Sequence, residues 1–199
     1  MSAVTDIRAL TLYVIRHGEC EHNAAGWAAG HDDSPLTELG RAQARANGRV
    51  LRGVAPRLDN LDFFASSLHR ACRTMELLRD EIGLPATDYR ADRRLMEIDL
   101  GNLTRAPGNA LRMAQQQVHQ VDSWHHAHPN GESPAAVYAR VGHFLESLAR
   151  DAVIVTHGIP LIAIRAHYLG LSGEQAMGYH MGNAGVLRLS QGTEALFGK

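Results

Sequence analysis

Two short apolar segments of this chain end in the same polar dipeptide, and this feature constrains the fold most. Residues 12–15 and 152–155 are apolar throughout, and His-Gly follows closely at 17–18 and 157–158. A strand that is apolar at every position has no side suited to water, so it predicts a place inside a sheet that is covered on both faces. The chain must supply the covering layers from its other segments.

The segments between the apolar runs have helical spacing. Thr37 is expected to be the N-cap of a helix whose apolar positions are Ala42, Ala46 and Val50. Three further helices are expected, over 67–83, from Ser133 onward and over 160–168. Three further strands are expected, over 61–66, near 86–90 and, as the last strand, over 185–190. This alternation predicts a three-layer α/β fold with a mostly parallel central sheet and helices on both faces.

Two of these helices have a clear buried face in the sequence. The helix over 67–83 is expected to bury Ala71, Met75 and Leu78 and to end at Gly83. The helix that follows Ser133 carries an apolar stripe of Val137, Val141, Phe144 and Leu148. The 199 residues are expected to form one domain, with a lid-like excursion at about 98–130 that has no clear period.

Charge and residue usage exclude several function classes. The net charge is −1, so neither nucleic acid nor an anionic membrane is an expected partner. Lys199 is the only lysine among the 20 basic residues, which excludes a Walker lysine and an internal Schiff base. Any anion site must therefore use arginine, histidine and backbone amides. No signal pattern and no apolar run of 18 residues is present, so a cytoplasmic protein is expected.

The two cysteines, Cys20 and Cys72, are too few for a disulfide scaffold in a chain of this length. Neither begins a Cys-x5-Arg loop, because the residues six positions on are Gly26 and Leu78. This excludes the cysteine-dependent phosphatases. A redox-sensitive pair and two small buried side chains both remain open.

Four cationic or potentially cationic side chains follow the predicted strands. Because parallel strands present their carboxyl ends at one edge, Arg16, His17, Arg70 and His157 are expected to meet there. They would repel one another unless an anion lay between them, and arginine donates to phosphate oxygens in pairs. A zinc site fits poorly, since no Cys or carboxylate has ligand spacing to these histidines and the arginines oppose a cation. The sequence thus predicts an anion site that needs no metal or other cofactor.

Several ordered motifs extend this site along almost the whole chain. They are "RHGECEHN" at 16–23, "SPLTELGRAQA" at 34–44, "SSLHRACRT" at 66–74, the Glu of "LMEIDLG" at 95–101, "PNGES" at 129–133 and "VTHG" at 155–158. Together, from about residue 11 to 190, they resemble the histidine phosphatase superfamily in its phosphoglycerate-mutase-like branch. The resemblance implies a phosphoglycerate-mutase-like fold and a phosphorylated small molecule as the substrate.

The resemblance also implies roles for individual residues. His17 would be the nucleophile that becomes a phosphohistidine, and Arg16, Arg70 and His157 would form the phosphate pocket. Glu97 would donate a proton to the leaving oxygen. Neighbouring guanidinium groups are expected to lower the pKa of the nucleophilic imidazole and keep it neutral.

Three residues are expected to bind substrate around this core. Asn23 would add an amide hydrogen bond, and Gly158 would let the backbone approach closely. Ser66 either donates to the phosphate or caps the following helix, and both roles remain open.

The chain departs from the family pattern after the acid. Ile98-Asp99-Leu100 stands where mutases usually carry Arg-His-Tyr, and Asn102-Leu103-Thr104-Arg105 follows Gly101. Asp99 is therefore the alternative acid. The excursion offers only Arg105 and Arg112 to hold a second anionic group, which favours hydrolysis over transfer. Its composition suggests neither a strongly cationic cradle nor an apolar slot.

Two further features of the excursion allow more than one interpretation. The histidines of this segment could bind a metal, or could form a polar stretch or contact the substrate; they are His119, His125, His126 and His128. Trp124 either covers the substrate or anchors the excursion.

These observations favour a metal-independent phosphomonoesterase that acts on a small phosphate ester. A phosphoglycerate or phosphosugar mutase and a phosphoprotein phosphatase are the alternatives. A binding protein without turnover is disfavoured by the intact set of nucleophile, acid and pocket residues. The sequence leaves a homo-oligomer open.

Overall fold

The computed structural model describes residues 6–110 and 124–198. Its centre is a six-stranded sheet with the order β3-β2-β4-β1-β5-β6. The strands are β1 Leu12–Arg16, β2 Asp62–Ser66, β3 Arg90–Asp92, β4 Ala152–Thr156, β5 Val186–Ser190 and β6 Thr193–Phe197. The first four in this sequence order pair in parallel, whereas β5 is antiparallel to β1 and to β6.

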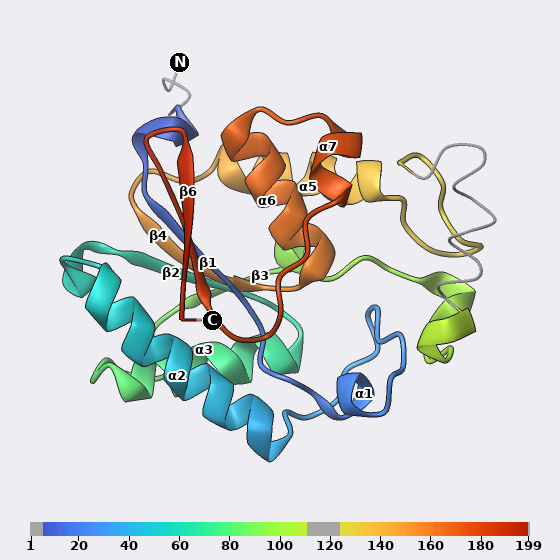
Figure 1. Cartoon of the computed structure of the whole chain (residues 1–199), viewed down its shortest axis with the longest axis horizontal. Helices are drawn as coiled ribbons and strands as arrows, with labels where there is room; N and C mark the ends of the chain where they lie inside the picture. Colours follow the sequence, from blue (N-terminus) through green and yellow to red (C-terminus); the bar gives the residue numbers. More distant parts are fainter. Residues whose placement is uncertain (1–5, 111–123, 199) are drawn as a thin grey trace.

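Helices cover both faces of this sheet. In the described part they are α1 Glu21–Ala24, α2 Glu38–Val54, α3 His69–Glu81, α5 Pro134–Leu145, α6 Gly158–Leu169 and α7 Gly173–Met177. Figure 1 shows α2 and α3 on one side of the sheet and α5, α6 and α7 on the other. The single turns of 3-10 helix are Ile7–Ala9, Leu58–Asn60, Arg93–Leu95 and Gly101–Leu103. The expected three-layer, mostly parallel α/β fold is confirmed.

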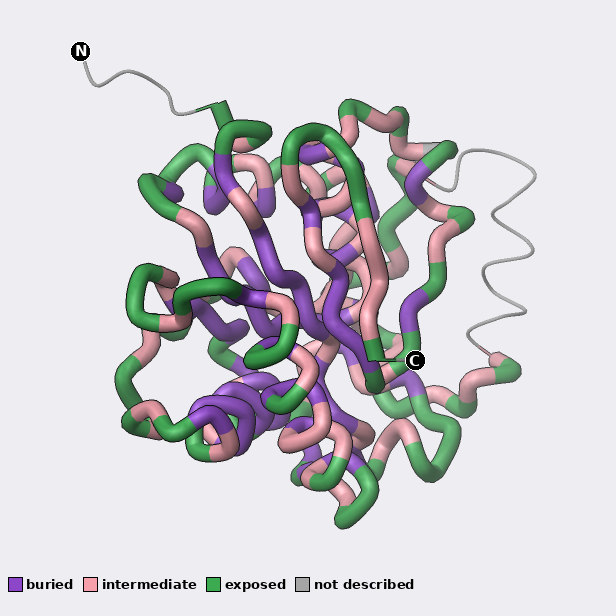
Figure 2. The backbone as a smooth tube through the Cα atoms, turned by 60° about the vertical axis from the view of Figure 1, so that its left-hand side comes forward, coloured by how far each residue is buried: buried purple, intermediate pink, exposed green. Residues whose placement is uncertain are grey.

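The alternation of side chains along the strands divides the core into two parts. Val14 and Ile154 pack with Val141 and Phe144 of α5. Their neighbours Ile15, Val155 and Val153 point to the other face and pack with α2 and α3. Figure 2 shows the resulting buried backbone in the centre of the molecule, surrounded by exposed loops. Both faces of the apolar strands are therefore shielded from water, as their composition requires.

The predicted faces of α3 and α5 are confirmed. Ala71, Met75 and Leu78 are buried in α3, and Gly83 follows its end with a φ of +79°. In α5 the Ser133 hydroxyl accepts a hydrogen bond from the Ala136 amide, and the predicted apolar stripe is buried. In both helices the predicted residues are apolar and recur at helical spacing, so periodicity identified them, but it missed Arg70, Thr74 and Arg79, which α3 also buries.

The predicted face of α2 is wrong, although Thr37 does cap this helix by accepting from the Gly40 amide. The buried side is Gly40, Ala44, Asn47, Gly48 and Leu51, and the predicted Ala42, Ala46 and Val50 lie outside it. A Cβ on Gly48 would lie 2.9 Å from the Leu78 carbonyl oxygen, so α3 packs directly against the glycine backbone. Small and polar residues at this contact hid the buried face from a hydrophobic pattern.

Several element boundaries also differ from the sequence prediction. α6 begins two residues before the predicted position 160, and β3 lies later than the predicted 86–90. The strand over 185–190 is not the last one, because β6 follows it as an antiparallel partner. The short helices α1 and α7 were not predicted. No helix in the described residues is both long and apolar enough to span a bilayer.

Candidate active site

Three adjacent strands, β2, β4 and β1, present polar residues at neighbouring carboxyl ends. Ser66 ends β2, His157 follows β4 and His17 follows β1. The rings of His17 and His157 lie 4.9 Å apart, and the His17 amide donates to the Thr156 carbonyl at 2.9 Å. Parallel pairing of β1 with β4 therefore brings together two histidines that are 140 positions apart in the sequence.

Close packing, not backbone freedom, requires the glycine after His17. A Cβ on Gly18 would lie 2.2 Å from the Gly40 carbonyl oxygen at the start of α2. The Gly18 amide donates to the Thr74 hydroxyl of α3 at 3.0 Å. The residue after the nucleophile is thus clamped between α2 and α3, which fixes the position of His17. The motif "SSLHRACRT" contains Thr74, but the sequence did not reveal this role.

The hydrogen bonds of His17 define its tautomer. Its Nδ1 lies 2.7 Å from the Gly18 carbonyl oxygen, which can only accept, so Nδ1 carries the proton. Its Nε2 accepts from Nε of Arg70 at 3.3 Å. Burial lowers the pKa of His17 well below its usual value, and the charges of Arg70 and Arg16 lower it further. The ring is therefore neutral, and the lone pair on Nε2 is directed to Arg70.

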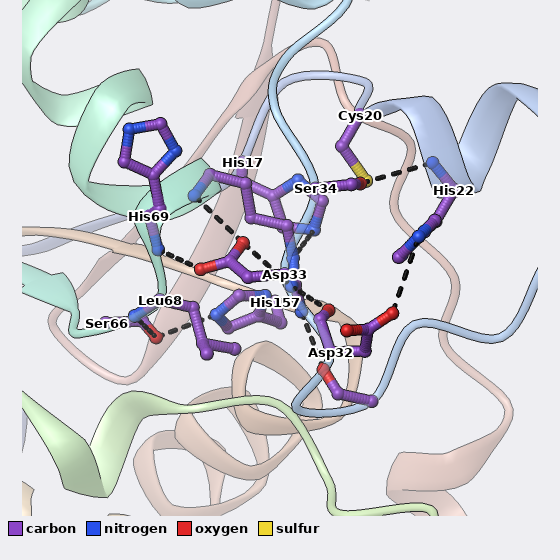
Figure 3. Close-up of polar contacts among 12 residues, drawn as sticks. His17, Cys20, His22, Asp32, Asp33, Ser34, Ser66, Leu68, His69 and His157 are labelled. Atoms are coloured by element: carbon purple, nitrogen blue, oxygen red, sulfur yellow. Dashed lines mark hydrogen bonds and ion pairs between the residues drawn. The ribbon is translucent and has the colours of Figure 1, made fainter. Parts of the chain in front are cut away.

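His157 is fully buried beside His17 and is held by Ser66. Its Nε2 lies 2.8 Å from the Ser66 hydroxyl, as Figure 3 shows. Burial lowers its pKa well below the usual value, with smaller contributions from His17 and the arginines. Its Nδ1 is buried without a hydrogen-bond partner in the described structure. His157 is not among the described residues that line the cavity, so its contact with phosphate stays a prediction.

Arg70 is buried and organises the loop before α2. It donates to the carbonyl oxygens of Gly30 and Asp32 at 2.8 and 2.9 Å, and it pairs with the Asp33 carboxylate at 3.3 Å. Asp33 also accepts from the amide of His69 (Figure 3). The expected repulsion among four cations does not occur, because both histidines are neutral and Asp33 balances Arg70. Asp33 was missed by the sequence analysis, since it lies in an irregular loop.

Arg16 retains hydrogen-bonding capacity. Its Nη1 donates to the Met181 carbonyl at 3.0 Å, but its Nε is buried and has no partner in the described structure. Arg16 forms no ion pair with any described residue, and it lines the cavity next to His17. An unpaired guanidinium N–H on an arginine that lines the cavity with His17 is a donor available to an anion.

The structure places the three predicted substrate-binding residues differently. Asn23 lines the cavity, and its Oδ1 accepts from the amide and thiol of Cys20, which leaves the Nδ2 donor for a ligand. Gly158 also lines the cavity, but its amide already donates to Glu97. Ser66 lies outside the described lining and contacts His157 instead. The Ser66 hydroxyl also accepts from the amide of Leu68, the N-cap residue of α3, at 3.3 Å, and its direct contact with phosphate stays a prediction.

Glu97 lies at the N-terminus of α6. Its carboxylate oxygens accept from the amides of Gly158 and Ile159 at 3.0 and 3.1 Å, and from its neighbour Ile98 at 3.0 Å. Oε1 accepts two of these bonds and Oε2 accepts one, so Oε2 keeps a lone pair that can carry a proton. The side chain lines the cavity with His17 and Arg70. Glu97 is thus placed where a leaving oxygen can reach it.

Two residues that the sequence analysis missed hold the backbone of Glu97. The Glu97 carbonyl oxygen lies 2.7 Å from Nε2 of His31 and accepts from Arg140 at 2.9 Å. Arg140 also donates to both oxygens of Glu132, which accepts in turn from the Asp99 amide. Arg140 lies in α5 between the buried Val137 and Val141, outside the apolar stripe. Nothing in the sequence therefore distinguished it from a surface arginine.

Asp99, the alternative acid, has other contacts. Its side chain accepts from the Gly101 amide at 2.8 Å and lies 3.5 Å from Nδ1 of His31. It is not among the described residues that line the cavity. The geometry therefore favours Glu97 over Asp99 as the group nearest the reacting centre.

A cavity of about 540 Å³ is lined by Arg16, His17 and Glu97 and also by residues of the excursion. His126 and His128 line it, and their rings lie 5.2 Å apart. Within 6–110 and 124–198, no three His, Cys, Asp or Glu side chains form a group that could hold a metal ion. His119 and Arg112, named from the sequence, lie outside the described residues.

Trp124 packs away from the cavity. A Cβ on Gly173 of α7 would lie 2.4 Å from its ring, which also meets the ring of Tyr138 edge-on at 5.6 Å. Of the two roles considered, anchoring of the excursion fits this position.

Both cysteines are free thiols. Cys20 is buried and donates to Asn23, and Cys72 donates to the Ser66 carbonyl at 3.2 Å. Burial raises the pKa of the Cys72 thiol, which lowers its reactivity. A redox role stays a prediction that these contacts do not support.

The fold and this edge of the sheet define the class of protein. The family model of the histidine phosphatase superfamily (branch 1) matches residues 12–196. The chain therefore belongs to the histidine phosphatase superfamily, in its phosphoglycerate-mutase-like branch.

Related sequences and related structures differ in their activities. The chain is 33% identical over 187 residues to a 2,3-bisphosphoglycerate-dependent phosphoglycerate mutase of Brucella melitensis, covering 88% of this chain and 89% of the mutase. It matches the crystal structure of an alpha-ribazole phosphatase from Shigella flexneri with a TM-score of 0.75 and 26% identity, over 95% of each chain. A mycobacterial glucosyl-3-phosphoglycerate phosphatase in complex with VO3 matches with a TM-score of 0.75 and 31% identity, over 96% of this chain and 98% of that one.

Proposed function

We propose that this protein is a metal-independent phosphomonoesterase that hydrolyses a small phosphate ester through a phosphohistidine on His17. The observation that carries this proposal is the state of His17: the Gly18 carbonyl holds its proton on Nδ1, and Nε2 carries the ring's lone pair, which accepts from Arg70 and would exchange that contact for phosphorus during attack. A nucleophile must be deprotonated at the attacking atom and must have the electrophile held in line with it. Both conditions are supported by the described contacts.

The first step transfers the phosphoryl group to the enzyme. The lone pair of His17 Nε2 forms a bond to phosphorus while the bond from phosphorus to the ester oxygen breaks. The bonding electrons leave with that oxygen, which takes a proton from Glu97 to become the free alcohol. Because both carboxylate oxygens of Glu97 accept backbone amides, the acid is fixed in position before the substrate arrives.

The second step returns the enzyme to its starting state. A water molecule gives a proton to Glu97 and attacks phosphorus, and the bond from phosphorus to His17 Nε2 breaks to release inorganic phosphate. Charge on the phosphoryl oxygens is stabilised by the guanidinium of Arg16 and by the remaining N–H of Arg70. These groups supply the positive charge that metal ions supply in kinases, so added metal is not required.

A phosphoglycerate mutase is the second candidate, and the 33% identity to the Brucella enzyme favours it. A mutase must hold a substrate with a second anionic group while phosphate moves between hydroxyls. Arg105, the excursion arginine within the described residues, is exposed and pairs with Asp32 at 2.5 Å. Arg16 and Arg70 are the only arginines among the described cavity-lining residues. Both lie with His17 in the part of the cavity that we call the phosphate end. This distribution supports hydrolysis.

A phosphoprotein phosphatase is less well supported. The phosphate end lies at the base of a cavity of about 540 Å³, and His17 is 3% exposed. A cavity of this volume is typical of small-molecule sites, whereas a folded phosphoprotein would need the phosphorylated side chain to reach a buried histidine.

The test is a rapid quench with labelled substrate in the presence of EDTA, followed by analysis of the products. We expect acid-labile, base-stable label on the wild-type protein and none on the His17→Ala variant, with inorganic phosphate as the final product. His143→Ala is the matched control, because His143 is exposed and remote from the cavity lining. Label that persists in His17→Ala, or a strict need for Mg²⁺ or Zn²⁺, contradicts the proposal. Phosphate retained on a second hydroxyl identifies a mutase.

A further inference from the structure

The outer part of the cavity has a chemistry that differs from its phosphate end. Beyond Arg16, His17 and Arg70, most of the described lining residues are apolar, and three of the contributing segments form mainly apolar walls; the segment at 126–134 adds the polar His126, His128 and Glu132. One wall is the loop with Trp27, and another is the first turns of α6 with Ile159 and Ile162. This distribution bears on the part of the substrate that lies beyond the phosphate.

Trp27 lies at the exposed edge of this cavity. It is 46% exposed, and it is one of two large hydrophobic residues that are exposed in the described structure; the other, Leu39, lies outside the cavity lining. The backbone of Trp27 is held by an isolated β-bridge to Pro107, and its ring lies 5.7 Å from the ring of His22. A tryptophan ring fixed at the mouth of a cavity offers a large flat apolar surface to a ligand.

The third wall is the segment after α7. Met177, Tyr179 and Met181 line the cavity there, and the Met181 carbonyl accepts from Arg16 at the phosphate end. Arg165 stacks over the Tyr179 ring at 4.4 Å and pairs with Glu194, so this arginine is occupied behind the wall. The segment at 177–181 therefore has two roles. The Met181 carbonyl accepts a hydrogen bond from Arg16, and the apolar side chains of the segment line the cavity.

Charged groups on the outer walls do not favour a second anion. The described carboxylates that line the cavity are Glu97 and Glu132, and Glu132 is already paired with Arg140. Burial and the neighbouring His126 lower the pKa of His128, and no arginine lines this outer part in the described residues. A carboxylate or second phosphate in this space would lose water and meet no fixed positive charge from the lining residues in 6–110 and 124–198.

We propose that the alcohol part of the substrate is an uncharged, largely apolar group that occupies the space between Trp27, Ile162 and Tyr179. The substrate class is thus a phosphate monoester of an apolar alcohol, not a sugar or glycerate that carries a second anion. This inference rests on the proposed function for turnover, but its binding preference can be measured without turnover.

The experiment uses n-alkylphosphonates from ethyl to hexyl, which cannot be hydrolysed, with binding measured by titration calorimetry. Burying one methylene group lowers the dissociation constant about three- to fourfold, so we expect a steady fall with chain length until the cavity is filled. A carboxyalkylphosphonate of equal length adds a second anion and is expected to bind at least about tenfold more weakly. A dissociation constant that does not change with chain length, or tighter binding of the carboxylate compound, overturns the inference.

Two variants locate the alkyl chain. Trp27→Ala and Ile162→Ala should each reduce the gain per methylene, while Leu39→Ala, an exposed apolar control outside the cavity, should leave it unchanged. Because Trp27 is half exposed, its truncation does not empty the core. A full chain-length effect in both cavity variants means that the chain binds elsewhere, and this also overturns the inference.

Turnover separates the two proposals. If phosphate esters are hydrolysed but the phosphonate series shows no chain-length effect, only the substrate inference fails. If no ester is hydrolysed while the chain-length effect is present, the apolar site stands and the proposed function fails.

Discussion

The two ends of the cavity are built in different ways. At the phosphate end, Arg16 and His17 are consecutive residues at the end of β1. A hydrogen bond to the Met181 carbonyl orients Arg16, and hydrogen bonds with the Gly18 carbonyl and Arg70 orient His17. At the outer end, apolar side chains come from the loop at 27–29, from α6 and from residues 177–181, and they meet by packing. The first end depends on directional contacts and the second on shape and surface area.

This difference separates chemistry from specificity. Hydrogen bonds and charges that act on the transferring group determine whether the reaction occurs at all. Apolar surface contributes affinity in proportion to the area buried and tolerates many shapes. Changes at the phosphate end should therefore affect every substrate alike, whereas changes at the outer end should affect substrates according to their size.

Arg16 provides the strongest test of this comparison. Arg16→Met removes the unpaired guanidinium N–H and should lower kcat/KM by about 10³- to 10⁵-fold, the order found for arginines that stabilise a transferring phosphoryl group. The loss should be equal for short and long alkyl phosphates, because every substrate carries the same phosphate. Steady-state kinetics on ethyl and hexyl phosphate measure this.

Arg105→Met is the matched control, since Arg105 is exposed and pairs with Asp32 away from His17. It should change kcat/KM less than about threefold, as expected for an exposed ion pair. A loss in Arg16→Met that depends strongly on chain length would show that the two ends are not independent.

Glu97→Gln should have the next largest effect, and only where the leaving group needs a proton. A positioned general acid contributes about 10²- to 10⁴-fold, so phosphorylation of the enzyme by an alkyl phosphate should slow by that factor. Phosphorylation by p-nitrophenyl phosphate should change little, because nitrophenolate is stable as an anion. Single-turnover rates compare the two.

Asp99→Asn is the control for this variant, because Asp99 lies outside the described cavity lining. If Glu97→Gln slows both substrates equally while Asp99→Asn slows only the alkyl ester, the acid has been misassigned. Thermal unfolding should accompany the kinetics, since Glu97 also accepts amide hydrogen bonds from α6.

Ser66→Ala distinguishes orientation of His157 from direct binding of phosphate. Its hydroxyl contacts His157 Nε2, so removal should lower kcat about tenfold, the equivalent of one hydrogen bond. The inhibition constant of inorganic phosphate should change less than about twofold. A rise in that constant as large as the one in Arg16→Met would make Ser66 a phosphate ligand.

The last prediction concerns stability, not catalysis. Burial lowers the pKa of both His17 and His157 in the folded protein, so the unfolded chain binds more protons once the pH falls below about 6.5. The free energy of unfolding should therefore decrease as the pH is lowered from 6.5, by up to about 2.7 kcal/mol per pH unit for two histidines. Urea unfolding at pH 7.5, 6.5 and 5.5 measures it.

His157→Gln should halve this dependence, because it removes one of the two buried groups, and His143→Gln, which changes an exposed histidine, should leave it unchanged. Equal pH dependence in wild type and His157→Gln would mean that His157 is not held neutral by burial.

The sequence alone predicted five of the six strands, the four longer helices of the described part and the residues proposed for the phosphate end of the site. These features depend on local signals: apolar runs such as 152–155 must be buried, and residues that follow parallel strands meet at one edge. Arg16, His17 and Glu97 were identified in this way and by the resemblance to the family. Those residues lie next to one another in the cavity, as expected.

Only the tertiary structure decided the contacts between segments that are distant in the sequence. The buried face of α2 depends on the backbone of α3 against Gly48, and the hold on Glu97 depends on Arg140 from α5. The apolar outer wall likewise joins Trp27, Ile162 and Tyr179, which no sequence period connects. Hydrophobic periodicity reports which side of one element is buried, but it carries no information about which other element lies against it, because that depends on how complementary surfaces pack.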